Sequence, residues 1–235
     1  MNKNEIIEYL NVRGISVNEE QYLRLVELKE STLKTNQEFN LTSITDDEEF
    51  IEKMILDSAL AVAHFDLNNK KFIDLGTGAG FPGLVIKILC PESDMTLLDS
   101  TKKKVDHLKS FIFDHHILGT VICERAEEHG SNPINRGTYD VVFARAVAPL
   151  NILLELAVPL LKVGGLLVAL KGKNADEEIA NATRSLKTLK CHLDKIYVDT
   201  LPISGEERKI VFIKKDGVTP IKYPRQFSQI KSKPL

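Results

Sequence analysis

Cysteine is scarce in this sequence, and neither a long apolar run nor an export signal is present. The three cysteines, at positions 90, 123 and 191, are too far apart to indicate a disulfide framework or a paired-cysteine metal site. No stretch approaches the ~20 apolar residues that span a bilayer, and the first five residues, MNKNE, show no signal-peptide pattern. These absences predict a protein of the reducing cytoplasm without membrane attachment.

Metal-ligand and nucleophile patterns are missing as well. None of the six histidines stands at ligand spacing from a carboxylate or a cysteine. No side chain pairs with a base in a pattern that would activate it as a nucleophile. We therefore expect no metal site and no covalent catalysis.

Neither sign of charge dominates the whole chain, but its two ends differ. The formal net charge is −2. Residues 1–65 hold thirteen acidic residues against six Lys and Arg, whereas residues 205–235 hold eight Lys and Arg against three acidic residues. A basic tail can contact nucleic-acid phosphates. A solvated terminus has the same composition, so both interpretations stay open.

The first part of the chain is expected to be helical. Apolar residues recur at helical spacing over residues 2–12 and again from Ser16 or Asn18 to Gln37. Thr45 and Glu48 have the spacing of a capping box, which predicts the start of a third helix. Most apolar side chains of these helices are expected to belong to a core.

From residue 71 short apolar runs alternate with helical patterns, which indicates an α/β domain with a largely parallel sheet. The expected strands cover residues 71–75, 95–98, 120–123, 139–144, 166–170, 195–200 and 208–213. Helices are expected after the first strand, from residue 101, over about 149–161 and over 175–189. The predicted division of the chain is a helical extension over 1–65, an α/β domain over 66–215 and a basic tail over 216–235.

A glycine-rich turn joins the first expected strand to a helix, in the sequence Asp74-Leu75-Gly76-Thr77-Gly78-Ala79-Gly80-Phe81-Pro82-Gly83. A strand, a glycine turn and a helix N-terminus in succession let backbone N–H groups approach a ligand closely. Two glycine registers fit known patterns. The register of Gly76, Gly78 and Gly80 after Asp74 resembles the first motif of class I S-adenosylmethionine (SAM) methyltransferases. The register that ends at Gly83 satisfies the dinucleotide fingerprint, but it leaves Gly76 stranded, and we favour the first.

Asp99 follows the second expected strand, where nucleotide-binding α/β folds place a carboxylate that accepts hydrogen bonds from ribose hydroxyls. SAM and NAD both carry that ribose, so Asp99 does not separate them. An ordinary helix-capping role is the alternative. With Asp74, Gly76, Gly78 and Gly80, it forms the predicted cofactor-binding set.

Cationic residues follow three further strands. Arg125, Arg145 and Lys171 each lie just beyond a strand end, at the sheet edge where open α/β folds bind ligands. Two cations beside a sulfonium cofactor favour an anionic or electron-rich substrate, such as an RNA phosphate or the O6/N7 edge of guanine. Surface ion pairs with Asp140 or Glu155 are the alternative.

The motifs in their order resemble the RsmG/GidB family, bacterial methyltransferases of small-subunit ribosomal RNA. The resemblance covers nearly the whole chain and includes the glycine turn. The other matching segments are Asn40-Leu41-Thr42, Leu56-Asp57-Ser58, Leu98-Asp99-Ser100, Arg125-Ala126-Glu127, Arg145-Ala146-Val147-Ala148, Ala169-Leu170-Lys171-Gly172 and Tyr223-Pro224-Arg225. Thr35 and Met54 depart from the family pattern, which usually has Trp and often has His at these positions.

The resemblance implies a class I SAM-dependent methyltransferase fold, which is a Rossmann-like, mostly parallel seven-stranded sheet with helices on both faces. By analogy, the last two strands would form a reversed antiparallel pair at one sheet edge. The implied activity is methyl transfer from SAM to N7 of a guanine in 16S rRNA. The expected partner is therefore 16S rRNA or the small ribosomal subunit, with no obligate protein partner evident.

The resemblance also implies roles for single residues. Cofactor contacts are expected from Gly76, Phe81, Ala126, Glu127 and Arg145. Substrate or catalytic roles fall to Asn40, Arg145 and Lys171. RNA contacts are expected from Lys103, Arg125, Lys171 and, in the basic tail, Arg225.

The expected reaction fits a site without a catalytic base. Guanine N7 has a free lone pair and no proton to remove, so the protein need only hold it in line with the methyl–sulfur bond. Because N7 in an A-form duplex faces a deep, narrow groove, we expect a target base in a loop or an opened position. Two other functions stay open on the residues alone: an NAD(P)-dependent oxidoreductase, and an RNA-binding ribosome-assembly factor without catalytic activity.

Overall fold

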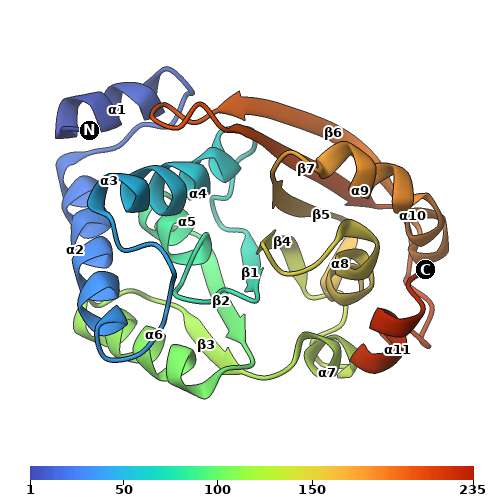
Figure 1. Cartoon of the computed structure of the whole chain (residues 1–235). Coiled ribbons are helices and arrows are strands. Elements are labelled where there is room, and N and C mark those ends of the chain that lie inside the picture. The colour runs from blue at the N-terminus through green and yellow to red at the C-terminus, as the bar shows by residue number, and fades with distance from the viewer.

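The computed structural model describes all residues, 1–235, as a seven-stranded sheet with helices on both faces (Figure 1). The strands are β1 (Lys71–Leu75), β2 (Asp94–Asp99), β3 (Thr120–Cys123), β4 (Tyr139–Arg145), β5 (Leu161–Lys171), β6 (Cys191–Thr200) and β7 (Glu207–Lys215). Their spatial order is β3-β2-β1-β4-β5-β7-β6. The order reverses between β1 and β4, which opens a crevice beyond the carboxyl ends of these strands.

One layer of helices comes from the first half of the chain. It comprises α1 (Lys3–Asn11), α2 (Glu19–Asn36), α3 (Asp47–Phe50), a π-helix (Ile51–Leu56), α4 (Asp57–Ala59), a 3₁₀ turn (Leu60–Val62), α5 (Gly83–Leu89) and α6 (Lys102–Asp114). These helices share one apolar core with alternate strand residues, among them Phe72, Val141 and Phe143. Leu10, Leu28 and Phe50 belong to the same core, so the N-terminal helices pack directly on the α/β part.

The second layer comes from the other half of the chain. It comprises α7 (Ala126–Ser131), α8 (Leu150–Ala157), a 3₁₀ turn (Val158–Leu160), α9 (Ala175–Asn181), α10 (Thr183–Leu189) and α11 (Phe227–Ser232). Its core contains Ile73, Val142 and Ala144, the neighbours in sequence of strand residues that face the first layer. This alternation follows from the two-residue period of a strand, and it buries the sheet on both faces.

The predicted fold class is confirmed, and so is the antiparallel pairing of the last two strands at one edge of the sheet. Only β7 runs against the other strands: it is antiparallel to both β5 and β6, while β6 returns to the common direction. Within the edge pair β7 alone is reversed, and it lies between β5 and β6. Strands β5, β6 and β7 are also longer than predicted.

Three predicted helix features were also wrong. Asp46, not Thr45, caps the third helix, because its carboxylate accepts hydrogen bonds from the N–H groups of Glu48 and Glu49. The same helix widens into the π-helix. The expected helix over residues 175–189 breaks at Ala182, where the Thr183 hydroxyl donates to the carbonyl of Ala180. Helices α7 and α11 were not predicted.

The C-terminal tail is folded against the second layer. Tyr223 and Ile230 are buried in its core, and Arg136 donates hydrogen bonds to the carbonyls of Tyr223 and Thr219. The solvated-terminus interpretation is therefore wrong. No helix of the protein has both the length and the apolar character needed to cross a membrane.

Candidate active site

Asp74 fixes the conformation of the glycine turn from the interior of the protein. Its Oδ2 atom accepts hydrogen bonds from the Thr77 hydroxyl, at 2.6 Å, and from the Gly83 N–H, at 2.8 Å. The residue is fully buried, and its Oδ1 atom has no hydrogen-bond partner. Burial raises the pKa of Asp74 to about 6, against the opposing effect of these hydrogen bonds. Asp74 therefore holds the shape of the turn and is not exposed at its surface.

The turn needs its glycines for two reasons. Gly76, Gly78 and Gly80 have φ angles of +69°, +62° and +98°, a region that other residues rarely adopt. A Cβ on Gly76 would also lie 2.9 Å from Val147 Cγ2. The Gly78 N–H donates to Asp99 Oδ2 at 3.0 Å, which ties the turn to the end of β2.

A cavity of about 160 Å³ lies beside this turn, and we call it the glycine-turn cavity. Its walls come from the ends of β1 and β2, from α7 and α8, from the loop after β4 and from α11. The lining residues are Gly76, Leu98, Asp99, Ser100, Glu124, Arg125, Ala126, Glu127, Val147, Leu156 and Phe227.

The donors and acceptors of the glycine-turn cavity fit the nucleoside half of SAM. Asp99 accepts one backbone N–H on each carboxylate oxygen, from Gly78 and from Thr101, and each oxygen keeps a second lone pair for a ribose hydroxyl. Leu98, Val147 and Leu156 supply apolar surface for a base. Ala126 and Glu127 line the cavity as expected.

Five predicted cofactor residues do not line this cavity: Asp74, Gly78, Gly80, Phe81 and Arg145. The Phe81 side chain is buried and packs edge-on against Phe50, with 5.5 Å between ring centroids. A Cβ on Gly80 would meet Leu84 and Leu108, so Gly80 faces α5 and α6. A direct contact of the Phe81 ring with a ligand in the glycine-turn cavity is not compatible with this placement.

A second, wider cavity of about 550 Å³ lies on the other side of Val147, which lines both. We call it the Arg145 cavity. Four cationic residues line it, together with two carboxylates and several apolar groups. The charged set is Lys53, Asp57, Arg145, Lys171, Glu178 and Arg208.

Arg145 is held by the π-helix and by α4. One of its guanidinium nitrogens donates to the Lys53 carbonyl at 2.6 Å and lies 3.5 Å from Asp57, and the other contacts the sulfur of Met54. Arg208, on β7, binds the second oxygen of Asp57 at 3.3 Å. Burial raises the pKa of the Asp57 carboxyl, and the two guanidinium groups oppose the rise.

Lys171 is fixed in a similar way. Its ammonium group lies 2.6 Å from Glu178 on α9 and donates to the Ala148 carbonyl at 2.8 Å. Arg145 and Lys171 thus line one cavity, as the sequence predicted. Their partners are Asp57 and Glu178, whereas Asp140 binds Lys162 and Glu155 binds Arg225.

The remaining predicted residues are dispersed. Asn40 is exposed in the loop between α2 and α3, outside both cavities. Lys103 lines a separate hollow over α6 and lies 5.9 Å from the Phe39 ring centroid. Arg125 lines the glycine-turn cavity, where it binds Glu127 at 3.2 Å. The Arg225 guanidinium binds the buried Glu155 at 2.6 Å, a contact that fixes the tail.

Sequence reasoning missed several residues of the site. No role was predicted for Asp57, although the Leu56-Asp57-Ser58 segment was part of the family resemblance. Lys53, Glu178, Arg208 and Phe227 stand in no recognisable motif, since they come from helices and strands far apart in the chain. A buried carboxylate facing two arginines is visible only after folding.

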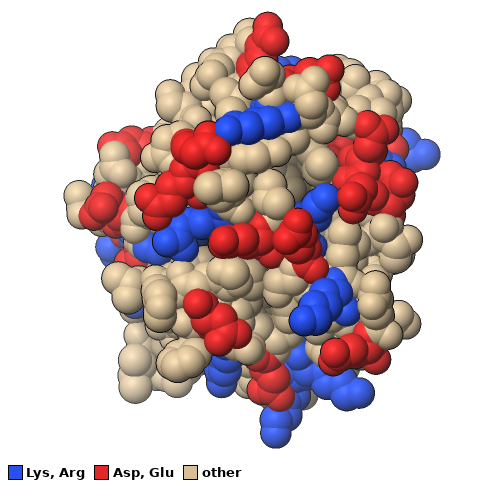
Figure 2. Space-filling model, turned by 90° about the vertical axis from the view of Figure 1, so that its left-hand side faces the viewer, with Lys and Arg blue, Asp and Glu red and all other residues tan.

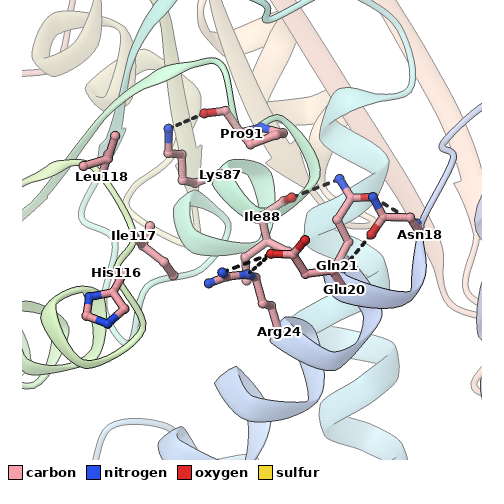
Figure 3. Close-up of a pocket in the computed structure, with 10 residues that line it drawn as sticks. All are labelled: Asn18, Glu20, Gln21, Arg24, Lys87, Ile88, Pro91, His116, Ile117 and Leu118. Atoms are coloured by element: carbon pink, nitrogen blue, oxygen red, sulfur yellow. Dashed lines mark hydrogen bonds and ion pairs between the residues drawn. The ribbon is translucent and has the colours of Figure 1, made fainter.

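A third hollow, of about 270 Å³, lies at the opposite end of the strands (Figure 3). There the Gln21 amide donates to the carbonyls of Ile88 and Leu89, and Lys87 donates to the carbonyls of Pro91 and Ser93. Gln21 thus joins α2 to α5, and Lys87 joins α5 to the loop before β2. We therefore interpret this hollow as part of the packing contact between these elements.

A family model described as "rRNA small subunit methyltransferase G" (GidB) matches residues 21–211. The chain belongs to this family. It is 40% identical over 232 residues to Ribosomal RNA small subunit methyltransferase G of Acetivibrio thermocellus, a match that covers 98% of this chain and 95% of the relative. The protein of the same name from Caldanaerobacter subterraneus is 43% identical over 206 residues, or 86% and 85% of the two chains.

Solved structures of other methyltransferases share the fold. A SAM-dependent methyltransferase from Aquifex aeolicus superposes with a TM-score of 0.51 at 17% identity, over 77% of this chain and 97% of that one. A SAM-dependent O-methyltransferase from Thermotoga maritima gives a TM-score of 0.51 at 13% identity, over 79% and 71%.

The predicted family and fold are thereby confirmed, and with them a SAM-dependent methyltransferase as the class of enzyme. The reversed β7 distinguishes this sheet from the all-parallel sheet of dinucleotide-binding domains. Neither the oxidoreductase nor the assembly factor without activity finds support in these relatives.

Proposed function

We propose that this GidB-family chain transfers the methyl group of SAM to N7 of a guanine in 16S rRNA. The observation that carries the proposal is the adjacency of two unlike cavities. The glycine-turn cavity suits a nucleoside, the Arg145 cavity contains four cationic side chains, and Val147 lies between them. The relatives that share 40% and 43% of their residues are named as methyltransferases of small-subunit ribosomal RNA.

The residues of the glycine-turn cavity would hold the cofactor. Asp99 accepts the ribose hydroxyls, and the positive-φ backbone at Gly76 and Gly78 lets the cofactor approach the turn without a side chain in the way. When bound, SAM supplies a methyl group already activated by its sulfonium sulfur. The chain itself need provide no nucleophile.

The Arg145 cavity would hold the guanine and its neighbouring phosphates. Arg145 and Lys171 present donors that can bind guanine O6 or a phosphate oxygen and so keep N7 in line with the methyl group. Correct positioning alone can supply several kcal/mol of the barrier, about 7 or more in favourable cases. No side chain has to remove a proton before N7 attacks.

The cations of this cavity are neutralised by protein carboxylates. Lys171 is paired with Glu178, and Arg145 and Arg208 are paired with Asp57. An RNA phosphate can exchange with a carboxylate because both are oxyanions of similar geometry. We infer that binding of the substrate replaces some of these internal pairs.

One side of the outer surface lacks the concentration of positive charge that would favour RNA binding. Figure 2 shows acidic and basic side chains interspersed on the face on the left of Figure 1, where Arg24 pairs with Glu20 and Lys29 with Asp47. A mixed surface gives no broad positive field. We therefore assign RNA contact to the Arg145 cavity, to Lys103 on α6 and to Asn40 in the loop between α2 and α3. A cytoplasmic location follows from the proposed substrate.

Mass spectrometry of 16S rRNA nucleosides from strains with and without the gene tests the proposal. The expected result is loss of one N7-methylguanosine in the deletion strain and its return with the wild-type gene. Identical nucleoside profiles in the two strains would refute it. A preparation that binds RNA but transfers no label from methyl-labelled SAM would instead support the assembly-factor alternative.

A further inference from the structure

Phe227 brings the C-terminal tail into the glycine-turn cavity. It is the first residue of α11, and its side chain lines the cavity together with Ala126, Glu127 and Leu156. In Figure 1 α11 lies beside α7 and α8, the two helices that carry these three residues. Residues about 130 positions apart in the chain, Ser100 and Phe227 among them, thus face one space.

The tail is anchored firmly enough to place this ring. The Arg225 backbone N–H and guanidinium donate three hydrogen bonds to Glu155, at 2.9, 2.8 and 2.6 Å, and Glu155 is fully buried. On the other side of Phe227, Ile230 is fully buried in the second core. With one anchor two residues before it and another three residues after it, the Phe227 ring has little freedom to leave the cavity wall.

Arg125 is held by the same ring. Its guanidinium carbon lies 4.9 Å from the Phe227 centroid, a cation–π distance, and its Nε atom binds Glu127 at 3.2 Å. The side chain that was expected to reach RNA is therefore engaged at the mouth of the glycine-turn cavity. Phe227 and Arg125 together present a flat, partly apolar surface.

We propose that Phe227 forms part of the adenine-binding wall of the SAM site, and that the C-terminal tail is thus a component of the cofactor pocket. The inference rests on the proposed placement of SAM in the glycine-turn cavity. An aromatic ring can stack on a purine base, whereas it offers a phosphate neither a hydrogen-bond donor nor a positive charge. The tail then contributes to cofactor affinity in place of the phosphate-contacting arm that its charge suggested.

The chain contains no tryptophan, which allows a direct test. Phe227→Trp places a single fluorophore in the cavity wall, and Phe113→Trp places one on α6, where Phe113 is 79% exposed. Titration with S-adenosylhomocysteine should change the emission of the Phe227→Trp protein with saturation. The Phe113→Trp protein should show no such change.

Affinity measurements by calorimetry complete the test. Phe227→Ala should weaken SAM binding by about tenfold, the loss typical of removing one aromatic contact to a base. Phe227→Tyr should bind SAM with the affinity of the wild type, because it keeps the aromatic ring. Thermal melts will show that each variant is folded. Asp99→Ala serves as the reference for loss of the cofactor site.

The outcomes separate this inference from the proposed function. Wild-type affinity in Phe227→Ala, with weakened binding in Asp99→Ala, would overturn the role of Phe227 and leave the cofactor placement intact. Unchanged emission of Phe227→Trp at saturating ligand would have the same meaning. Normal SAM binding by Asp99→Ala would refute the cofactor placement itself, and the inference with it.

Discussion

The two cavities on either side of Val147 each lie against a buried carboxylate, and the two carboxylates have different kinds of partner. Asp74, below the glycine-turn cavity, accepts hydrogen bonds from a hydroxyl and a backbone N–H and forms no ion pair. Asp57, in the Arg145 cavity, lies between the guanidinium groups of Arg145 and Arg208. One cavity is thus shaped by backbone geometry and the other by opposite charges.

The difference matches what each cavity is proposed to bind. A small cofactor gains from a wall that is already in place, because no ordering is required on binding. A polyanion gains from cations that can change partners, since a phosphate can take the place of a carboxylate at a guanidinium or ammonium group. Four predictions test this contrast, from the largest expected effect to the smallest.

Removal of Asp57 should cause the largest loss of stability. Asp57→Ala leaves Arg145, whose side chain is only 14% exposed, without its carboxylate, and breaking such a pair costs about 3 kcal/mol or more. The melting temperature should fall by roughly 6–12 °C for a chain of this size. Asp47→Ala is the matched control, because Asp47 also pairs with a cation, Lys29, but its own side chain is 69% exposed. Equal melting temperatures of the two variants would contradict the buried network.

Asp74 should make the free energy of unfolding depend on pH, although it forms no ion pair. Since burial raises the pKa of Asp74 to about 6, the folded state holds this proton more tightly than the unfolded chain. The resulting stability is fully present below about pH 4 and is lost as the pH rises through about 6, at most about 3 kcal/mol. Asp74→Asn should flatten the unfolding free energy over this range in urea titrations. If the unfolding free energy of Asp74→Asn varied with pH in parallel with that of the wild type, Asp74 would not be the group responsible.

Asp99 and Lys171 should separate the two binding events. Asp99→Ala removes charge-assisted hydrogen bonds worth about 1.5–3 kcal/mol each, so SAM affinity should fall by roughly 100-fold while RNA affinity is kept. Lys171→Ala should reduce methylation of 16S rRNA and the salt dependence of RNA binding, with SAM affinity unchanged. Calorimetry with SAM and filter binding with RNA measure both. Parallel losses of both ligands in either variant would mean that the cavities are not independent.

The smallest expected effect is the difference in stability between two alanine substitutions, each at one glycine of the two cavities. Gly76→Ala should destabilise the protein by about 1–3 kcal/mol, because φ is +69° and Val147 lies 2.9 Å from the added Cβ. Gly172→Ala, in the Arg145 cavity, should be nearly neutral, since no atom lies within 4 Å of the added carbon. Chemical denaturation measures both. Similar costs at the two positions would indicate that the turn tolerates a side chain.

Local patterns predicted the elements that depend on neighbours in sequence. The alternation of strands and helices, the glycine turn and the position of Asp99 at the end of β2 all appear as expected. Such features could be predicted because strand period, turn conformation and helix capping are properties of a few consecutive residues. The break at Ala182 and the cap at Asp46 were missed, since side chains compete there for the same backbone groups.

By itself the sequence determined the family, the fold class and the carboxyl-end edge at which the site lies, because each depends on short motifs in a fixed order. Only the tertiary structure decided which charges meet. Asp57 and Arg208 are far apart in the chain, and so are Arg125 and Phe227, yet each pair is in contact after folding. A motif contains no information on partners that the packing of distant helices and strands brings together.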